Sequence, residues 1–252
     1  MNRRSLFFSS TALALATLSS GAARAQGVDE FGAYGDTSPA SDQYLALEVR
    51  FGPYLPNVDD EFSDAAPFEE TFGNDNRYLL GLEVDWQALR IPNVGSFGPG
   101  IGWGYTTMSA DAPFADGTGL SEQETSLSLM PMYLVGVFRV DALAQQTPVP
   151  LAAYAKAGLG YALWWVSDGA GTAEAGDVSG QGASYGYQFA LGGMLLLDAL
   201  DRESAVRMDA ASGINNSYFF IEWYFSRLDG FGAVDQMQVG TSTWMLGLVF
   251  EI

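Results

Sequence analysis

Six charged residues lie on segments of alternating polarity, where they would share one face of a sheet: Glu48, Arg50, Glu83, Asp85, Lys156 and Glu222. Clustered carboxylates of this kind serve as general acids and bases, as metal ligands, or as partners of arginine and lysine in a buried ionic network. We expect the network, because unpaired buried charge is costly and two cations are at hand to balance the acids. A catalytic carboxylate pair, Glu83 with Asp85 beside Glu48, is the less favoured interpretation.

Two residue types that carry much of enzyme chemistry are missing, since the chain contains neither histidine nor cysteine. This excludes the Ser-His-Asp triad, imidazole metal ligands, thiolate nucleophiles, disulfides and iron-sulfur sites. We therefore expect a protein that is not an enzyme and has no cofactor. The 11 basic and 30 acidic residues give a formal net charge of −19, which repels phosphate, so nucleic acid partners are not expected.

The segment 55–76 is rich in acids and contains no basic residue. Its candidates for a cation site are Asp59, Asp60, Glu61 and Asp64, because calcium binds clustered carboxylates. The segment lacks the spacing of an EF-hand loop. We favour a solvated acidic surface that meets anionic lipopolysaccharide through divalent ions, with no metal site in the protein itself.

Residues 1–25 have the pattern of a secretory signal peptide. Arg3 and Arg4 precede a short apolar stretch, and Ala23-Arg24-Ala25 forms a small-residue cleavage site. The arginine pair also leaves a twin-arginine export route open beside the ordinary Sec route. Cleavage would remove three arginines from the net charge of −19 and leave −22. We expect residues 26–42 to be a flexible periplasmic segment and residues 43–252 to form the folded domain.

The folded domain shows alternation with a period of two, the pattern of β-strands. No apolar run reaches the ~18 residues that a spanning helix needs. The segments with this pattern are 44–52, 78–87, 97–105, 125–140, 154–165, 185–195, 218–225 and 243–252. They predict an all-β fold, an eight-stranded antiparallel transmembrane β-barrel, because backbone groups in lipid must be paired and the sheet must therefore close on itself.

The composition of the two rows distinguishes a membrane barrel from a soluble, lipocalin-like barrel. Aromatic residues stand at the ends of the apolar rows, as in the girdles of membrane barrels. The opposite rows combine charges with glycine, and Gly98, Gly100, Gly102 and Gly104 occupy one face of a single segment. We expect these glycines to face the interior and make room for large side chains from the opposite wall. The apolar row would then face lipid.

Loop lengths predict the orientation. The connections after the first, third, fifth and seventh strands are long and would face outward, which places both ends of the barrel in the periplasm. These loops together hold sixteen acidic residues against Arg227. The connection between the sixth and seventh strands is long for a periplasmic turn, and Asp201 and Gly213 are suitable start and stop signals for a short helix at 202–212. We expect this helix to plug the periplasmic mouth, with partner docking as the alternative.

The fourth segment is apolar on both faces, so hydropathy alone does not decide which of its rows faces the interior. One row contains Leu127, Leu129, Tyr133, Val135 and Val137, and the other contains Met130, Met132, Leu134 and Phe138. If the second row faces the interior, its four residues would line a site for a small apolar ligand. This is the feature that favours a conduit over a filled barrel.

The signal peptide, the eight segments and the final strand Trp244-Met-Leu-Gly-Leu-Val-Phe-Glu-Ile252 resemble small bacterial outer-membrane barrels of the OmpA, OmpX and OmpW kind. The segments 191–201 and 213–218 are also similar to uncharacterised myxobacterial-type barrels. The resemblance implies location in the outer membrane of a Gram-negative bacterium, contact with its lipid and lipopolysaccharide, and insertion by the barrel-assembly machinery. That machinery usually reads a terminal aromatic residue, whereas this chain ends in Ile252.

The expected function is therefore a structural or surface-interaction role for a monomeric barrel with a filled polar interior and acidic extracellular loops. The alternative is an OmpW-like narrow conduit or binding site for small apolar molecules. Eight strands enclose too little space for a wide, general porin channel.

Overall fold

Strands in the structure follow the alternation in the sequence. The computed structural model describes residues 44–75, 77–113, 120–168, 171–175, 178–233 and 236–252. The predicted signal peptide (1–25) and the predicted periplasmic segment (26–42) lie outside these residues. Among the described residues, no helix is both long enough and apolar enough to cross a membrane.

Eight long strands form the barrel: β1 (Leu45–Pro53), β2 (Tyr78–Trp86), β4 (Gly95–Pro113), β5 (Leu120–Val140), β6 (Leu151–Ser167), β9 (Gln181–Leu196), β10 (Asn216–Arg227) and β11 (Ser242–Glu251). Each pairs antiparallel with the next long strand, and β1 pairs with β11. This pairing closes the sheet, so the predicted eight-stranded antiparallel barrel is confirmed. A short strand, β3 (Leu89–Ile91), pairs with β4, while β7 (Glu174–Ala175) and β8 (Val178–Ser179) form a separate two-stranded sheet.

The strands of the β4–β5 hairpin are longer than the sequence pattern predicted. They contain 19 and 21 residues, whereas a transmembrane strand needs roughly 9–11. Their outer parts carry polar residues such as Ser109, Asp111 and Glu124. The hairpin therefore extends beyond the apolar band of the barrel.

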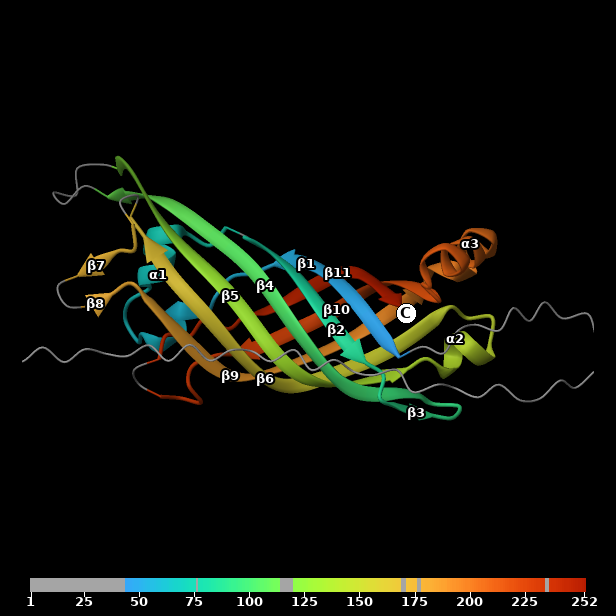
Figure 1. The fold of residues 1–252 in the computed structure, drawn as a ribbon. Coiled ribbons are helices and arrows are strands. Elements are labelled where there is room, and N and C mark those ends of the chain that lie inside the picture. The colour runs from blue at the N-terminus through green and yellow to red at the C-terminus, as the bar shows by residue number, and fades with distance from the viewer. Residues whose placement is uncertain (1–43, 76, 114–119, 169–170, 176–177, 234–235) are drawn as a thin grey trace, which may run out of the picture. The chain divides into compact units, whose positions relative to one another are not determined.

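The connections contain the helices: η1 (Val58–Glu61), α1 (Pro67–Phe72), α2 (Ala142–Gln146), η2 (Leu197–Ala199) and α3 (Arg202–Ser212). Figure 1 shows α1, β7 and β8 at one end of the barrel, the loop end, and shows α2, α3 and the C-terminus at the other, the terminal end. The long connections after β1, β6 and β10 leave their strands at the loop end, as their lengths predicted, whereas β4 and β5 take up much of the long connection predicted at 109–124.

The predicted helix is α3, and its bounds are confirmed. The Asp201 carboxylate accepts a hydrogen bond from the Ser204 backbone N–H at 3.0 Å, and Gly213 ends the helix with φ of 72°. The expected role as a plug is not supported, because none of the α3 side chains with a described burial is buried, and Leu200, just before the helix, is 72% exposed. The main neighbours of α3 are η2 and β10, and Figure 1 shows the helix beyond the strand ends.

The outer face of the barrel is apolar. Leu82, Ile101, Leu159 and Leu191 are each at least 44% exposed and belong to four different strands. Aromatic rings gather on this face toward the loop end. The ring centroids of Phe51 and Tyr78 lie 5.0 Å apart, and those of Tyr105 and Trp165 lie 6.2 Å apart. Such an exposed surface is stable in lipid and would be costly in water.

The interior is filled in two different ways. At the loop end it holds a continuous apolar cluster: Tyr54, Val58, Phe68, Leu79, Met108, Leu127, Leu129, Ala162, Tyr224, Leu228, Val239 and Met245. Loops contribute to this cluster, since the Tyr54 hydroxyl donates to the Val239 carbonyl at 2.7 Å and the Thr241 hydroxyl donates to the Leu55 carbonyl at 2.7 Å. The terminal half contains the buried ionic residues, beside a second apolar cluster that includes Met194, Phe220 and Val249. The buried ionic network therefore lies in one half of the interior.

Two glycines in the interior rows lie beneath tyrosine rings of neighbouring strands. Gly102 is the direct cross-strand partner of Tyr133, and a Cβ on Gly102 would lie 2.0 Å from that ring. Gly192 has the same relation to Tyr154. This corrects the expectation that the β4 glycines make room for the opposite wall, because the side chains nearest to Gly100, Gly102 and Gly104 come from the adjacent strands β2 and β5.

Candidate functional site

The six charged residues predicted to share an interior face are brought together in the terminal half of the barrel. Glu48 and Arg50 come from β1, Glu83 and Asp85 from β2, Lys156 from β6 and Glu222 from β10. All six are at most 2% exposed. Alternation on each strand turns these side chains inward because their outward neighbours are apolar.

Lys156 holds together two carboxylates that would otherwise repel each other. Glu48 and Glu83 are direct cross-strand partners on β1 and β2, an unfavourable position for like charges. The Lys156 ammonium group reaches across from β6, 2.6 Å from Glu48 Oε2 and 2.8 Å from Glu83 Oε1. One cation therefore bridges the pair.

Arg50 binds three carboxylates with one nitrogen. Its Nη2 lies 2.9 Å from Glu48 Oε2, 2.7 Å from Glu83 Oε2 and 3.2 Å from Glu222 Oε1. Tyrosines complete the hydrogen bonds: Tyr133 donates to Glu83 Oε2 at 2.6 Å, and Tyr154 donates to Glu222 Oε2 at 2.8 Å. These are two of the rings that cover interior glycines, so the glycines also set the positions of the network's hydroxyl donors.

Two members of the network were missed in the sequence, Arg139 on β5 and Glu251 on β11. They form an ion pair at 2.5 Å, and both are buried. Arg139 also lies 3.6 Å from Glu48 Oε1 and 3.5 Å from Asp85 Oδ2. Strand parity was the available signal, since Arg139 shares its row with Tyr133 and Val135. A charge in that row indicates that the row faces the interior.

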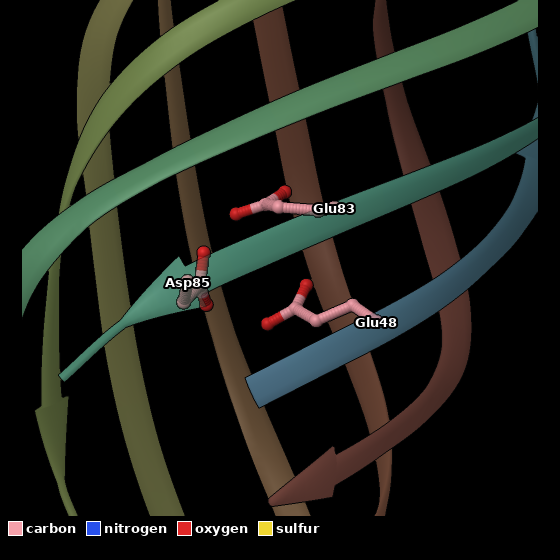
Figure 2. Close-up of side chains that lie close together, drawn as sticks. All are labelled: Glu48, Glu83 and Asp85. Carbon is pink, nitrogen blue, oxygen red and sulfur yellow. The ribbon is translucent and has the colours of Figure 1, made fainter. Parts of the chain in front are cut away.

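The described network has more acids than bases. Glu48, Glu83, Asp85, Glu222 and Glu251 face Arg50, Arg139 and Lys156. Three of the acids, Glu48, Glu83 and Asp85, have carboxylate oxygens within 4.8 Å of one another, and Figure 2 shows their side chains extending from β1 and β2 into the interior. Neither Asp85 oxygen accepts a hydrogen bond among the described residues.

This acid group is a poor fit for a bound metal ion. Oxygen ligands for a hard cation must be free to turn toward it. Both oxygens of Glu83 are already engaged, one by Lys156 and the other by Tyr133 and Arg50. The Lys156 ammonium also occupies the position between Glu48 and Glu83 from which a cation would bridge them. The arrangement suits a structural ionic network better than a metal centre or a catalytic acid pair.

The residues predicted to line an apolar site lie on the outer side of β5. Leu134 is 58% exposed and Phe138 is 37% exposed, while Met130 and Met132 in the same row are half-buried. Tyr133, Val135 and Val137 occupy the interior row. The condition for an interior apolar site is therefore not met, because Met130, Met132, Leu134 and Phe138 lie in the opposite row. The register is set by the ionic network and the glycine stripe of β4, which accept only one face of this strand.

Met132 and Leu134 nevertheless border an apolar groove. It has a volume of about 580 Å³ and lies across β2, β4, β5 and β6, with Ile101, Trp103 and Leu159 among its other walls. These wall residues belong to the exposed outer row. An apolar molecule that contacts Met132 and Leu134 would therefore bind from the membrane side.

The four loop acids do not form one cluster. Asp59 accepts the backbone N–H groups of Phe68 and Glu69 at 2.8 and 2.9 Å, which fixes the start of α1. Glu61 accepts the backbone N–H of Gln238, and burial raises its pKa above the ordinary value. Asp60 and Asp64 belong to the loop surface. Asp59 and Glu61 thus organise the loop through backbone contacts.

No family model and no curated protein matches the chain. Among solved structures, it is similar to the attachment invasion locus protein Ail of Yersinia pestis, crystallised with the heparin analogue sucrose octasulfate, at 13% identity over 83% of this chain and 97% of Ail, with a TM-score of 0.43. Outer membrane protein OprG of Pseudomonas aeruginosa is 12% identical over 83% and 96%, with a TM-score of 0.48. Neisserial surface protein A is 10% identical over 83% and 97%, with a TM-score of 0.41.

Proposed function

We propose that this chain is an integral outer-membrane β-barrel without enzymatic activity, and that it acts through its stable wall and its acidic loops. The observation that carries the proposal is the division of side chains by strand parity. One row is apolar and exposed on the outside, and the other fills the interior with an apolar cluster and an ionic network. A closed sheet with an apolar exterior is a form that a chain of strands can take in lipid.

Burial of the network argues against catalysis. The side chains of Glu48, Arg50, Glu83 and Lys156 are at most 3% exposed, and the apolar cluster lies between them and the loop end. A substrate would have to displace packed side chains to reach the carboxylates. Pairing with arginine and lysine is the ordinary role of such buried acids.

The outward surface of the proposed barrel would be the loop end. Both barrel termini lie at the terminal end. This end would face the periplasm, because the short turns of outer-membrane barrels lie on the periplasmic side. The acidic loops would then meet lipopolysaccharide through divalent ions. The barrel-assembly machinery would insert the protein as a monomer, reading a last strand that ends in Ile252.

Refolding and conductance test this proposal. Refolded protein should run as a compact band that shifts on heating, and in planar bilayers it should give no steps above the lipid background. A protease added to intact cells should cut in the connection between β1 and β2 and leave the connection between β5 and β6 whole. Stable conductance steps would contradict the filled interior, and cleavage at α2 would contradict the orientation.

A second candidate, an OmpW-like conduit or binding site for small apolar molecules, is favoured by the outer groove at Met132 and Leu134. The pairing of β4 with β5 is interrupted beside this groove. The cross-strand pairs of β4 and β5 include Trp103 with Met132 and Thr106 with Leu129, but not the two positions between them. Pro131, whose nitrogen carries no hydrogen to donate, lies at this gap.

Replacement of Pro131 tests the second candidate. In a conduit that uses this gap, Pro131→Val would restore a ladder hydrogen bond and slow the uptake of an apolar solute such as naphthalene into liposomes that contain the protein. Met132→Trp would fill the groove and have the same effect. Equal uptake by the two variants, the unchanged protein and protein-free liposomes would exclude the conduit.

A further inference from the structure

A second concave site lies at the loop end, separate from the ionic network and from the outer groove. It has a volume of about 510 Å³ and opens among the loops. Its walls include Phe62, Phe68 and Phe72 from the β1–β2 connection, Leu127 and Trp164 from β5 and β6, and Met237 from the β10–β11 connection. Pockets for small molecules commonly measure about 300–1,000 Å³ and have such apolar and aromatic walls.

The aromatic walls of this loop-end pocket are held in place. The rings of Phe68 and Phe72 lie 5.3 Å apart, and Phe68 is only 6% exposed. The Trp164 indole lies close over Gly182 of the neighbouring strand, where a Cβ would come within 2.5 Å of its ring. Asp59 fixes the start of the helix that carries the phenylalanines. A preformed aromatic site loses little conformational entropy when it binds a ligand.

Two polar atoms of the lining residues have no partner among the described residues. The Trp164 indole N–H is buried without an acceptor, and the Gln236 side-chain oxygen is buried without a donor. Buried polar groups are normally hydrogen-bonded, and an unmatched one is costly. A ligand with one acceptor and one donor would satisfy both atoms. The carboxylate among the described lining residues, Glu61, already accepts the Gln238 backbone N–H.

We infer that the loop-end pocket binds a small, uncharged, planar aromatic molecule with a hydroxyl group. The rings of the pocket would contact the aromatic plane, and the ligand hydroxyl would accept from Trp164 and donate to Gln236. The acidic surroundings disfavour anions. This site goes beyond the proposed surface role and does not require that the barrel conduct.

Nuclear magnetic resonance of the folded protein in lipid nanodiscs tests the site, with 2-naphthol as the probe. The adjacent tryptophans give an internal control, because Trp164 belongs to the pocket whereas Trp165 lies beside Tyr105 in the outer aromatic girdle. The Trp164 indole N–H signal should shift and saturate as 2-naphthol is added. The Trp165 signal should shift only in proportion to the amount of probe dissolved in the lipid.

Variants identify the contacts. Trp164→Phe keeps a ring but removes the N–H, so affinity for 2-naphthol, followed on a Phe72 ring signal, should fall roughly threefold to tenfold, the range for one hydrogen bond. Affinity for naphthalene, which has no hydroxyl, should stay the same. Val166 on β6 also lines the pocket, so Val166→Trp should fill it and abolish saturable shifts. Phe231→Ala, which removes a 60% exposed ring outside the pocket at the same end, should have no effect.

Three results would overturn the inference. One is a Trp164 signal in the unchanged protein that follows the same non-saturable course as Trp165, a test that needs no variant to fold. Another is equal loss of affinity for 2-naphthol and naphthalene in Trp164→Phe. The third is an equal, saturable shift with 1-decanol, which would indicate an aliphatic chain as the occupant. The heat-dependent gel shift, recorded for each variant, separates loss of the pocket from failure of the proposed barrel.

Discussion

The two halves of the barrel interior are packed by different physical rules. At the loop end, side chains such as Leu129 and Met108 are held by shape and by exclusion of water. At the terminal end, Glu48, Arg50 and Lys156 are held by charge, and each depends on specific partners. An apolar cluster loses stability in proportion to the volume removed, whereas an ionic network loses most when one charge is left without its counterpart.

Removal of Lys156 should have the largest effect on stability. Lys156→Met leaves Arg50 as the one described cation that contacts both Glu48 and Glu83, and breaking a buried ion pair in this way costs roughly 3–5 kcal/mol. Guanidinium unfolding of the protein in detergent micelles measures the loss. The double variant Lys156→Met with Glu83→Gln is the matched control and should recover part of it. If the single variant were as stable as the unchanged protein, the ionic half would not be held by pairing.

A cavity in the loop half should lower the free energy of unfolding somewhat less. The loss should depend on whether the inner or the outer face of β5 is changed. Leu129 is fully buried, so Leu129→Ala should cost about 2–4 kcal/mol by the same measurement. Leu134→Ala on the same strand removes a side chain that is 58% exposed and should cost about 1 kcal/mol or less. The reverse order would show that β5 is turned the other way, with Leu134 inside.

Titration of Glu61, beside the loop half, should have a smaller effect on stability. Burial raises the pKa of the Glu61 carboxyl above its ordinary value of 4.5, and the Gln238 backbone N–H partly opposes this. Between those two pKa values the folded protein holds more protons than the unfolded chain, so stability should fall as pH rises through that window. Glu61→Gln should remove this slope. Hydrogen exchange of the Gln238 amide at several pH values measures it, and an unchanged slope in the variant would assign the dependence to another group.

The smallest effect should occur outside both halves, at α3. Hydrogen bonds from Ser204 lower the pKa of Asp201 below its ordinary value of 3.8. The cap therefore stabilises the helix above that value and is lost as pH falls through the lowered pKa. Asp201→Ala should speed amide exchange in the first turn of α3 and leave the unfolding midpoint of the barrel unchanged. A drop in that midpoint would show that α3 is coupled to the barrel after all.

Much of the fold could be predicted because the patterns that determine it are local. Alternation located the eight strands, and the Asp201 and Gly213 signals located α3 within its observed bounds. The orientation of β5 could not be read from hydropathy, since both of its faces are apolar. Only Arg139 distinguished the two rows, and its meaning depends on partners from distant strands such as Glu251.

The loop-end pocket could not be predicted for a similar reason. Its walls come from four parts of the chain, and none of the phenylalanines belongs to an alternating segment. The connections were predicted only as long, polar and acidic. Their inward-folding residues, Tyr54, Phe68 and Val239, are separated by stretches that have no regular period. Packing of loops is set by tertiary contacts, which local sequence does not encode.

The rings that cover interior glycines have a consequence for how this sequence can vary. Tyr133 with Gly102 and Tyr154 with Gly192 each share one fixed volume between adjacent strands. Enlarging either member alone forces a collision, whereas exchanging the two residues would preserve their combined side-chain volume. Substitutions at these positions should therefore be tolerated in compensating pairs. In relatives of this chain, the two positions of each pair should vary together even where neither residue is retained.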